Sequence, residues 1–158
     1  MKTLPSKLFP GCAFSGAEAA GFYDIIPQGY DHVVSLYLAK ETVQDETTIA
    51  NAAVFFDKLP QWDSFCRNAF LAADDEDSEM ITEYFAFYQE EAPEVFGVAE
   101  PEALSLTDMV NRLVLSHMGA HGKGNDQCFN VDFTLGYDQL LSVYFDSDGG
   151  FDHMAWES

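Results

Sequence analysis

The stretch FNVDFTL, residues 129–135, decides the fold of this chain, because apolar and polar residues alternate along it. A period of two is typical of a β-strand with one face on the core and one face in water. Two further β-rich runs follow it, LLSVYF at residues 140–145 and FDHMAW at residues 151–156. The run DSDGG between them is typical of a turn, since glycine adopts positive φ and aspartate bonds its own backbone. Residues 129–158 therefore predict a three-stranded antiparallel meander.

Upstream of the meander, the chain reads as two strands followed by helices. The strands are predicted at residues 22–26 and 33–38, joined by a hairpin connection that contains Pro27 and Gly29. Apolar residues then recur at helical spacing in four segments. The first helix follows a capping Asp45, the second begins at Pro60, the third covers residues 77–91, and the fourth runs from Ser105 to His117. Residues 74–77 are predicted to form the loop before the third helix.

This order predicts an α+β fold in one domain, residues 1–158. The expected core is an antiparallel sheet of about five strands, two N-terminal and three C-terminal, with about four helices packed on one face. Apolar residues make up 47% of the chain, which excludes intrinsic disorder and supports a core without disulfides or metals; no cofactor is expected. Three widely spaced cysteines, Cys12, Cys66 and Cys128, suit free thiols in a reducing compartment. No signal peptide or membrane-spanning run is readable, so a cytoplasmic protein is expected.

The charge balance indicates which classes of partner the protein attracts and which it repels. Seven basic residues face 27 acidic ones, a formal net charge of −20. Such a field repels nucleic acid and anionic membranes and attracts cationic partners. The excess is concentrated in residues 59–104, where twelve acidic residues accompany a single base, Arg67. We therefore expect a cationic protein partner, no nucleic acid and no membrane surface.

The expected partner-binding residues lie in and after the third helix: Asp74, Asp75, Glu76, Asp77, Glu79, Glu83, Phe87, Glu90, Glu91 and Glu94. Phe87 belongs to this set because it falls off the main apolar face of the helix, where an exposed aromatic side chain can anchor a partner. The alternative interpretation is a solvated helix face that covers an aromatic core.

Motifs for chemistry are sparse. His117 and His121 are four apart, which puts both on one face of a helix, but Met118 follows His117 and the HExxH pattern is absent. The DSDGG run resembles the start of a calcium loop without its later ligands, so we interpret it as a turn. No nucleophile motif, P-loop or dinucleotide glycine pattern is present, and no catalytic or metal-binding residue is predicted. One enzyme alternative remains, in which four carboxylates converge on a divalent ion: Asp132, Asp146, Asp148 and Asp152.

The C-terminal segment also carries a family resemblance. The run VDFTLGYDQLL at residues 131–141, the Asp-Gly turn at 146–149 and the terminal AWES are similar to the C-terminus of a bacterial domain-of-unknown-function family. Members of that family end in a strand, a short Asp-Gly turn and a terminal Trp-Glu-Ser. Similar small, acidic α+β proteins occur as immunity proteins beside polymorphic toxins. The resemblance implies a fold and a bacterial origin, and it assigns no catalytic residue.

Three hypotheses for function follow from charge and resemblance. The first is an acidic protein-binding module, an immunity or inhibitor protein that neutralises a cationic bacterial toxin by occlusion. The second is a carboxylate- and metal-dependent enzyme of unknown reaction. The third is a DNA mimic that occupies a DNA-binding protein, which uses the same charge argument with a different partner.

Overall fold

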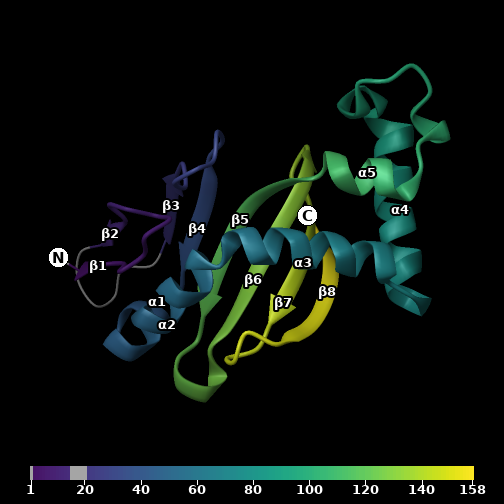
Figure 1. Cartoon of the computed structure of the whole chain (residues 1–158). Helices are drawn as coiled ribbons and strands as arrows, with labels where there is room; N and C mark the ends of the chain where they lie inside the picture. Colours follow the sequence, from purple (N-terminus) through teal and green to yellow (C-terminus); the bar gives the residue numbers. More distant parts are fainter. Residues whose placement is uncertain (1, 15–20) are drawn as a thin grey trace.

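A computed structural model describes residues 2–14 and 21–158 of the chain (Figure 1). Within these ranges it contains five α-helices and eight β-strands. The strands are β1 (Lys2–Thr3), β2 (Ala13–Phe14), β3 (Gly21–Ile25), β4 (Val34–Leu38), β5 (Val114–His121), β6 (Cys128–Gly136), β7 (Gln139–Phe145) and β8 (Phe151–Glu157). The helices are α1 (Lys40–Val43), α2 (Glu46–Asp57), α3 (Leu59–Ala72), α4 (Asp75–Glu91) and α5 (Leu106–Arg112), with 3₁₀ turns η1 (Pro93–Phe96), η2 (Pro101–Ala103) and η3 (Gly124–Asp126).

Six strands form one sheet in the order β3-β4-β5-β6-β7-β8, while β1 and β2 pair separately. The predicted hairpin β3–β4 and the predicted meander β6–β7–β8 are both present and antiparallel. The meander turn also forms as expected, because Asp146 Oδ1 accepts from the backbone N–H of Asp148 at 3.0 Å and of Gly150 at 2.8 Å. The α+β class is therefore confirmed.

The largest error in the predicted pattern lies at residues 114–117, which were expected to continue the fourth helix. Ser105 caps α5 as expected, since its side chain accepts from the N–H of Asp108, but the helix ends at Arg112. The chain then extends at Leu113 and continues as β5, which pairs parallel with β4 and antiparallel with β6. Hydrogen bonding along both of its edges outweighs the helical spacing of the apolar residues. The sheet therefore has six strands, and it is mixed rather than antiparallel.

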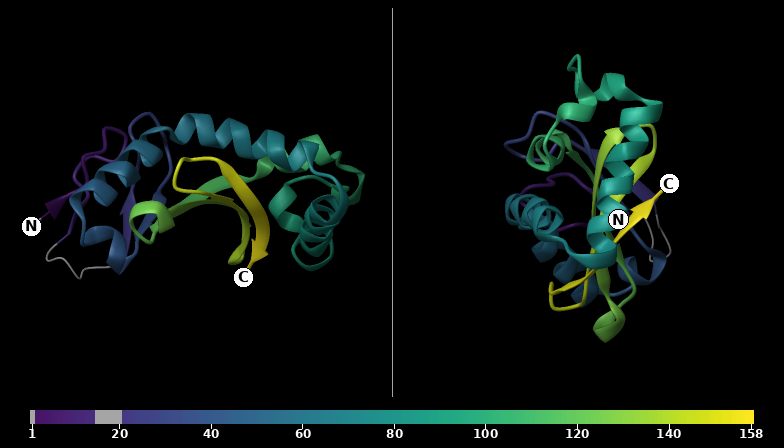
Figure 2. Two further views of the ribbon diagram at one scale, coloured as in Figure 1. Left: turned by 90° about the horizontal axis from the view of Figure 1, so that it is seen from below. Right: turned by 90° about the vertical axis from the view of Figure 1, so that its right-hand side faces the viewer.

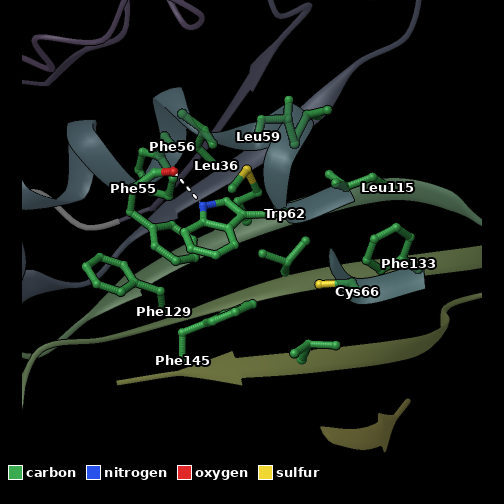
Figure 3. Packing of buried hydrophobic residues seen from close by; sticks show 14 of the residues in the cluster. Leu36, Phe55, Phe56, Leu59, Trp62, Cys66, Leu115, Phe129, Phe133 and Phe145 are labelled. Atoms are coloured by element: carbon green, nitrogen blue, oxygen red, sulfur yellow. Dashed lines mark hydrogen bonds between the residues drawn. The ribbon is translucent and has the colours of Figure 1, made fainter. Parts of the chain in front are cut away.

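Helices α2 and α3 cover one face of the sheet. Asp45 caps α2 by accepting from the N–H of Thr48 at 2.9 Å, and Pro60 lies in the first turn of α3, as predicted. Their aromatic side chains meet those of the strands (Figure 3). Phe55 stacks on Phe129 at 4.2 Å between ring centroids, and Trp62 stacks on Phe55 at 4.7 Å while its Nε1–H donates to the Phe55 carbonyl at 2.8 Å. This contact joins both helices to the centre of the sheet.

The acidic run at residues 74–77 was predicted to be a loop, but this prediction is wrong, because helix α4 already begins at Asp75. Asp74 precedes it in an extended conformation, so the acidic side chains lie in the first turn, where the helix dipole favours negative charge. The opposite side of α4 is aromatic and buried. Tyr84 donates to the Gln139 carbonyl at 2.9 Å and Tyr88 donates to the Gly136 carbonyl, so α4 holds the β6–β7 turn.

The other face of the sheet has no helix on it, and Figure 2 shows all helices on one side of the strands. The residues of strand β6 alternate between the two faces of the sheet, as predicted. Phe129, Val131 and Phe133 are buried under the helices. Asn130 and Asp132 lie between them and belong to the uncovered side. We call this uncovered side the open face.

Candidate functional site

Four of the predicted partner-binding carboxylates form one line on α4. Counting 100° per residue places Glu76, Glu79, Glu83 and Glu90 within a sector of about 60°. All four are exposed, and the buried residues Ile81, Tyr84, Phe85 and Tyr88 lie on the opposite side of the helix. We call these four glutamates the α4 acidic stripe.

The remaining predicted residues lie around this stripe. Asp74 and Asp75 are exposed at the start of the helix, and Glu91 is exposed near its end. Asp77 is half-buried, because it points toward the side of α4 that faces α3 and β8. The structure therefore brings the acidic residues of α4 onto one element, but it does not place all of them on one face.

Phe87 is less exposed than its position in the sequence predicts. It is half-buried, with its ring 5.8 Å from that of Trp156 on β8. The other aromatic residues interleaved with the acids, Tyr84, Tyr88 and Phe96, are buried. The aromatic side chains of α4 therefore attach the helix to the sheet.

Glu94 lies beyond α4, in η1, and contacts the β6–β7 turn. Its Oε1 accepts from the Tyr137 hydroxyl at 2.8 Å. The backbone N–H of Glu94 and this hydroxyl lower the pKa of the carboxyl group. The same contact raises the pKa of Tyr137. Glu94 is thus held against the fold, and Tyr137 is 63% exposed beside it.

Few basic side chains neutralise these acids. Across residues 2–14 and 21–158, the one pair of a Lys or Arg with a carboxylate is Arg67–Asp63 at 2.9 Å. The stripe carboxylates consequently face water without counter-charges from the described chain. Their mutual repulsion is reduced only by solvent and salt.

An apolar hollow lies next to the start of α4, between α3 and β8. Its volume is about 460 Å³, and its walls include Phe65, Ala69, Phe151 and Met154, with Asp74 and Asp77 among the lining residues. Phe65 and Phe151 are 40% and 45% exposed, and their ring centroids are 6.3 Å apart. We call this the Phe65–Phe151 hollow.

Sequence reasoning missed this hollow. Phe65 fits the apolar spacing of α3 together with Trp62 and Cys66, and the spacing predicts a core position for all three. The structure buries Trp62 and Cys66, whereas Phe65 lies at the margin, where α3 passes the edge strand β8. A large exposed apolar pair of this kind is informative on a chain with a net charge of −20.

The residues considered for metal binding do not gather. His117 and His121 share a face, as predicted, but that face belongs to strand β5 and not to a helix. Asp132 lies in the middle of β6, opposite Ser142, whereas Asp146 follows the end of β7, four residues and about 13 Å beyond Ser142. In the parts of the chain that the structure describes, no three His, Cys, Asp or Glu side chains are arranged to hold one metal ion.

Comparison with known proteins adds no relative to this picture. No family model, curated protein or solved structure matches the chain. Among the described residues, no helix combines the length and the apolar character that crossing a bilayer requires.

Proposed function

We propose that this protein is an acidic protein-binding module that captures a cationic protein. The observation that carries the proposal is the Phe65–Phe151 hollow beside carboxylates that have no basic partner in the described chain. Apolar area supplies affinity when it is buried, and an uncompensated field of one sign selects a partner of the other sign. The two features lie together at the start of α4.

The two features have separate roles in binding. The α4 acidic stripe faces away from the sheet, so it acts on a partner at a distance and accelerates the encounter. The hollow offers Phe65 and Phe151 as anchors, with Asp74 and Asp77 beside them for a Lys or Arg of the partner. An apolar side chain next to a basic one on the partner satisfies both requirements.

As its biological role, we propose neutralisation of a cationic bacterial toxin by occlusion. A toxin that acts on an anionic substrate carries a basic surface, and an acidic protein docked there blocks access to the substrate. The formal net charge of −20 favours such a complex at long range. The carboxylate and metal enzyme and the DNA mimic remain predictions, and no structural observation favours either of them.

The test starts from the partner itself. The tagged protein is used to capture its partner from a lysate of the organism that carries the gene, and the product of any neighbouring toxin-like gene is tested directly. Binding kinetics are then measured with the purified partner at low and at high salt. We expect a sub-micromolar complex whose association rate falls as salt rises.

Three variants separate the two roles. Reversing Glu76, Glu79 and Glu83 to lysine should slow association at least tenfold at low salt, whereas Phe65→Ala should mainly accelerate dissociation. A matched triple of exposed acids outside α4, Asp31, Glu41 and Asp126 to lysine, controls for net charge. If the control triple slows association as much as the stripe triple, net charge alone explains binding and the proposed surface is wrong.

A further inference from the structure

The open face of the sheet holds a second hollow, far from α4 in the strand order and independent of the proposed function. It lies over β3, β4, β5 and β6 and has a volume of about 350 Å³. That volume is at the lower end of the range of about 300–1,000 Å³ that is usual for small-ligand sites. Its lining includes Phe22, Tyr37, His117, His121, Asn130 and Asp132. We call it the open-face hollow.

Gly119 makes this hollow possible. It lies in the middle of β5, between Tyr37 on β4 and Asn130 on β6. A Cβ atom at this position would collide with Asn130 Oδ1 and would lie 2.9 Å from His121 Nε2. The missing side chain therefore leaves room for the polar groups of the neighbouring strands to meet over the backbone.

Those groups form a chain that ends at a buried carboxylate. His121 Nε2 is 2.8 Å from Asn130 Oδ1, and Asn130 Nδ2 donates to Asp132 Oδ1 at 2.9 Å. Asp132 is only 7% exposed, although it lies on the uncovered side of the sheet. Burial raises the pKa of Asp132, while the Asn130 amide, the Ser142 hydroxyl and the nearby His117 oppose that rise.

The buried Asp132 carboxylate accepts from Asn130 and lies near His117, but it forms no ion pair with a Lys or Arg of the described residues. In residues 2–14 and 21–158, no Lys or Arg nitrogen lies within ion-pair distance of its carboxylate. Buried acids are rare in proteins unless a cation or a full set of donors compensates them. Asn130 and Ser142 supply two donors, and a carboxylate accepts about four. The site therefore has unused capacity for a cationic donor.

Aromatic rings line the approach to this carboxylate. The Phe22 and Tyr37 rings are 5.1 Å apart between centroids, and those of Tyr37 and His121 are 5.2 Å apart. Phe22 is 68% exposed, the largest exposed fraction among the large apolar side chains of the described residues. Such a row of rings suits a flat, positively charged group, because cations are attracted to aromatic faces.

We propose that the open-face hollow binds a guanidinium group, stacked on Tyr37 and Phe22 and paired with Asp132. Guanidinium is planar, stacks on rings and donates in a fork that matches a carboxylate. The buried carboxylate and the net charge of −20 disfavour an anion in the same place. The chemistry fits two sources, a small guanidinium compound or an arginine side chain of another protein.

Titration with matched probes tests the proposal. Binding of agmatine and of Nα-acetyl-arginine amide is followed by amide NMR shifts and by calorimetry, with concentrations up to about 10 mM to cover millimolar affinities. Nα-acetyl-lysine amide supplies a cation without the flat fork, and Nα-acetyl-citrulline amide supplies the flat group without the charge. We expect both guanidinium probes to bind at least tenfold more tightly than the other two, with shifts at Tyr37, Gly119 and His121.

The two guanidinium probes distinguish the sources. Equal binding of both shows that an arginine on a peptide backbone reaches the hollow, whereas binding of agmatine alone assigns it to a small compound. Both results support guanidinium recognition. Absence of shifts at Tyr37, Gly119 and His121 with either probe would overturn the proposal, and so would equal binding of the lysine or citrulline probe.

Variants assign the binding to the hollow. Asp132→Asn keeps the shape of the side chain and should weaken binding at least tenfold, while Glu102→Gln removes the same charge from an exposed side chain in η2 and should leave binding unchanged. Phe22→Ala alters a highly exposed side chain, so it folds even where Asp132→Asn does not, and it should weaken binding severalfold. Unchanged binding in Phe22→Ala, or equal losses in Asp132→Asn and Glu102→Gln, would show that the probe binds elsewhere.

Discussion

The two faces of the six-stranded sheet are made from the same strands, and they carry opposite chemistry. Under the helices, Met118, Val131 and Val143 lie opposite one another on β5, β6 and β7 and are fully buried. One residue further along, His117 on β5 faces Asp132 on β6 on the open side. A displacement of one residue thus separates the residues that stabilise the fold from those that can bind a ligand.

The largest expected effect is on the covered face. Phe129→Ala removes a buried ring that stacks on Phe55 at 4.2 Å, and it should lower the free energy of unfolding by about 3–5 kcal/mol. Tyr144→Ala is the matched change on the open face, where the ring stacks on His153, and it should cost about 1 kcal/mol or less. Urea denaturation measures both variants. Equal losses would mean that the open face stabilises the fold as strongly as the covered one.

The next effect concerns Gly119, a closely packed position on the open face. Gly119→Ala puts a methyl group against Asn130 and His121 in the middle of the sheet and should cost about 1–3 kcal/mol. It should also abolish guanidinium binding in the open-face hollow. Gly21→Ala is the control, because a Cβ on that glycine of β3 meets no atom of the described residues within 4 Å. A stable Gly119→Ala variant with an intact hollow would contradict the packing described for β5.

A smaller, pH-dependent effect is expected at Asp132. Because burial raises its pKa, the native state binds this proton more tightly than the unfolded chain, and ionisation costs stability as pH rises through the native pKa. The cost is complete at neutral pH and disappears below the ordinary Asp value of 3.8. Asp132→Asn, which cannot ionise, should therefore be more stable than the natural protein at neutral pH.

The difference between the two proteins is the quantity to measure. Urea denaturation of both from about pH 4 to about pH 7 cancels the contributions of the other carboxylates, which change equally in each. The advantage of Asp132→Asn should shrink as the solution becomes more acidic. A difference that stays constant with pH would show that Asp132 is ionised without penalty.

Local patterns predicted the elements that have a single period. The alternation in residues 129–135 gave β6 and its wet face, and the capping residues Asp45 and Ser105 marked the starts of α2 and α5. The prediction for the segment that forms β5 was wrong because its apolar positions also fit a helix. Only pairing with β4, which is distant in sequence, and with the following strand β6 decides between the two structures.

The same limit applies to the candidate sites: local sequence predicts the acidic helix, but it does not predict the two hollows, which form only in the folded chain. The concentration of acids between residues 74 and 94 is visible in the sequence, and helical geometry arranges part of it into the stripe. The Phe65–Phe151 hollow and the open-face hollow join residues from strands and helices far apart in the chain. Asp132 and His117 were both noticed as candidates, but their register across β5 and β6 brings them together only in the folded protein.

Helix α4 repeats the division of the sheet, with buried tyrosines on one side and the acidic stripe on the other, and it gives the smallest expected effect. Glu79 is three or four residues from Glu76 and Glu83, spacings at which like charges repel by about 0.2–0.5 kcal/mol per pair. Glu79→Gln should therefore stabilise the protein by about 0.5 kcal/mol in about 0.01 M salt, and the gain should vanish in about 1 M salt, where charges a few ångströms apart are already screened. Urea denaturation at the two salt concentrations measures this gain, with Glu41→Gln, outside the stripe, as the control. A stripe that gains nothing at low salt does not concentrate negative charge, and its role in steering a cationic partner would then lose its physical basis.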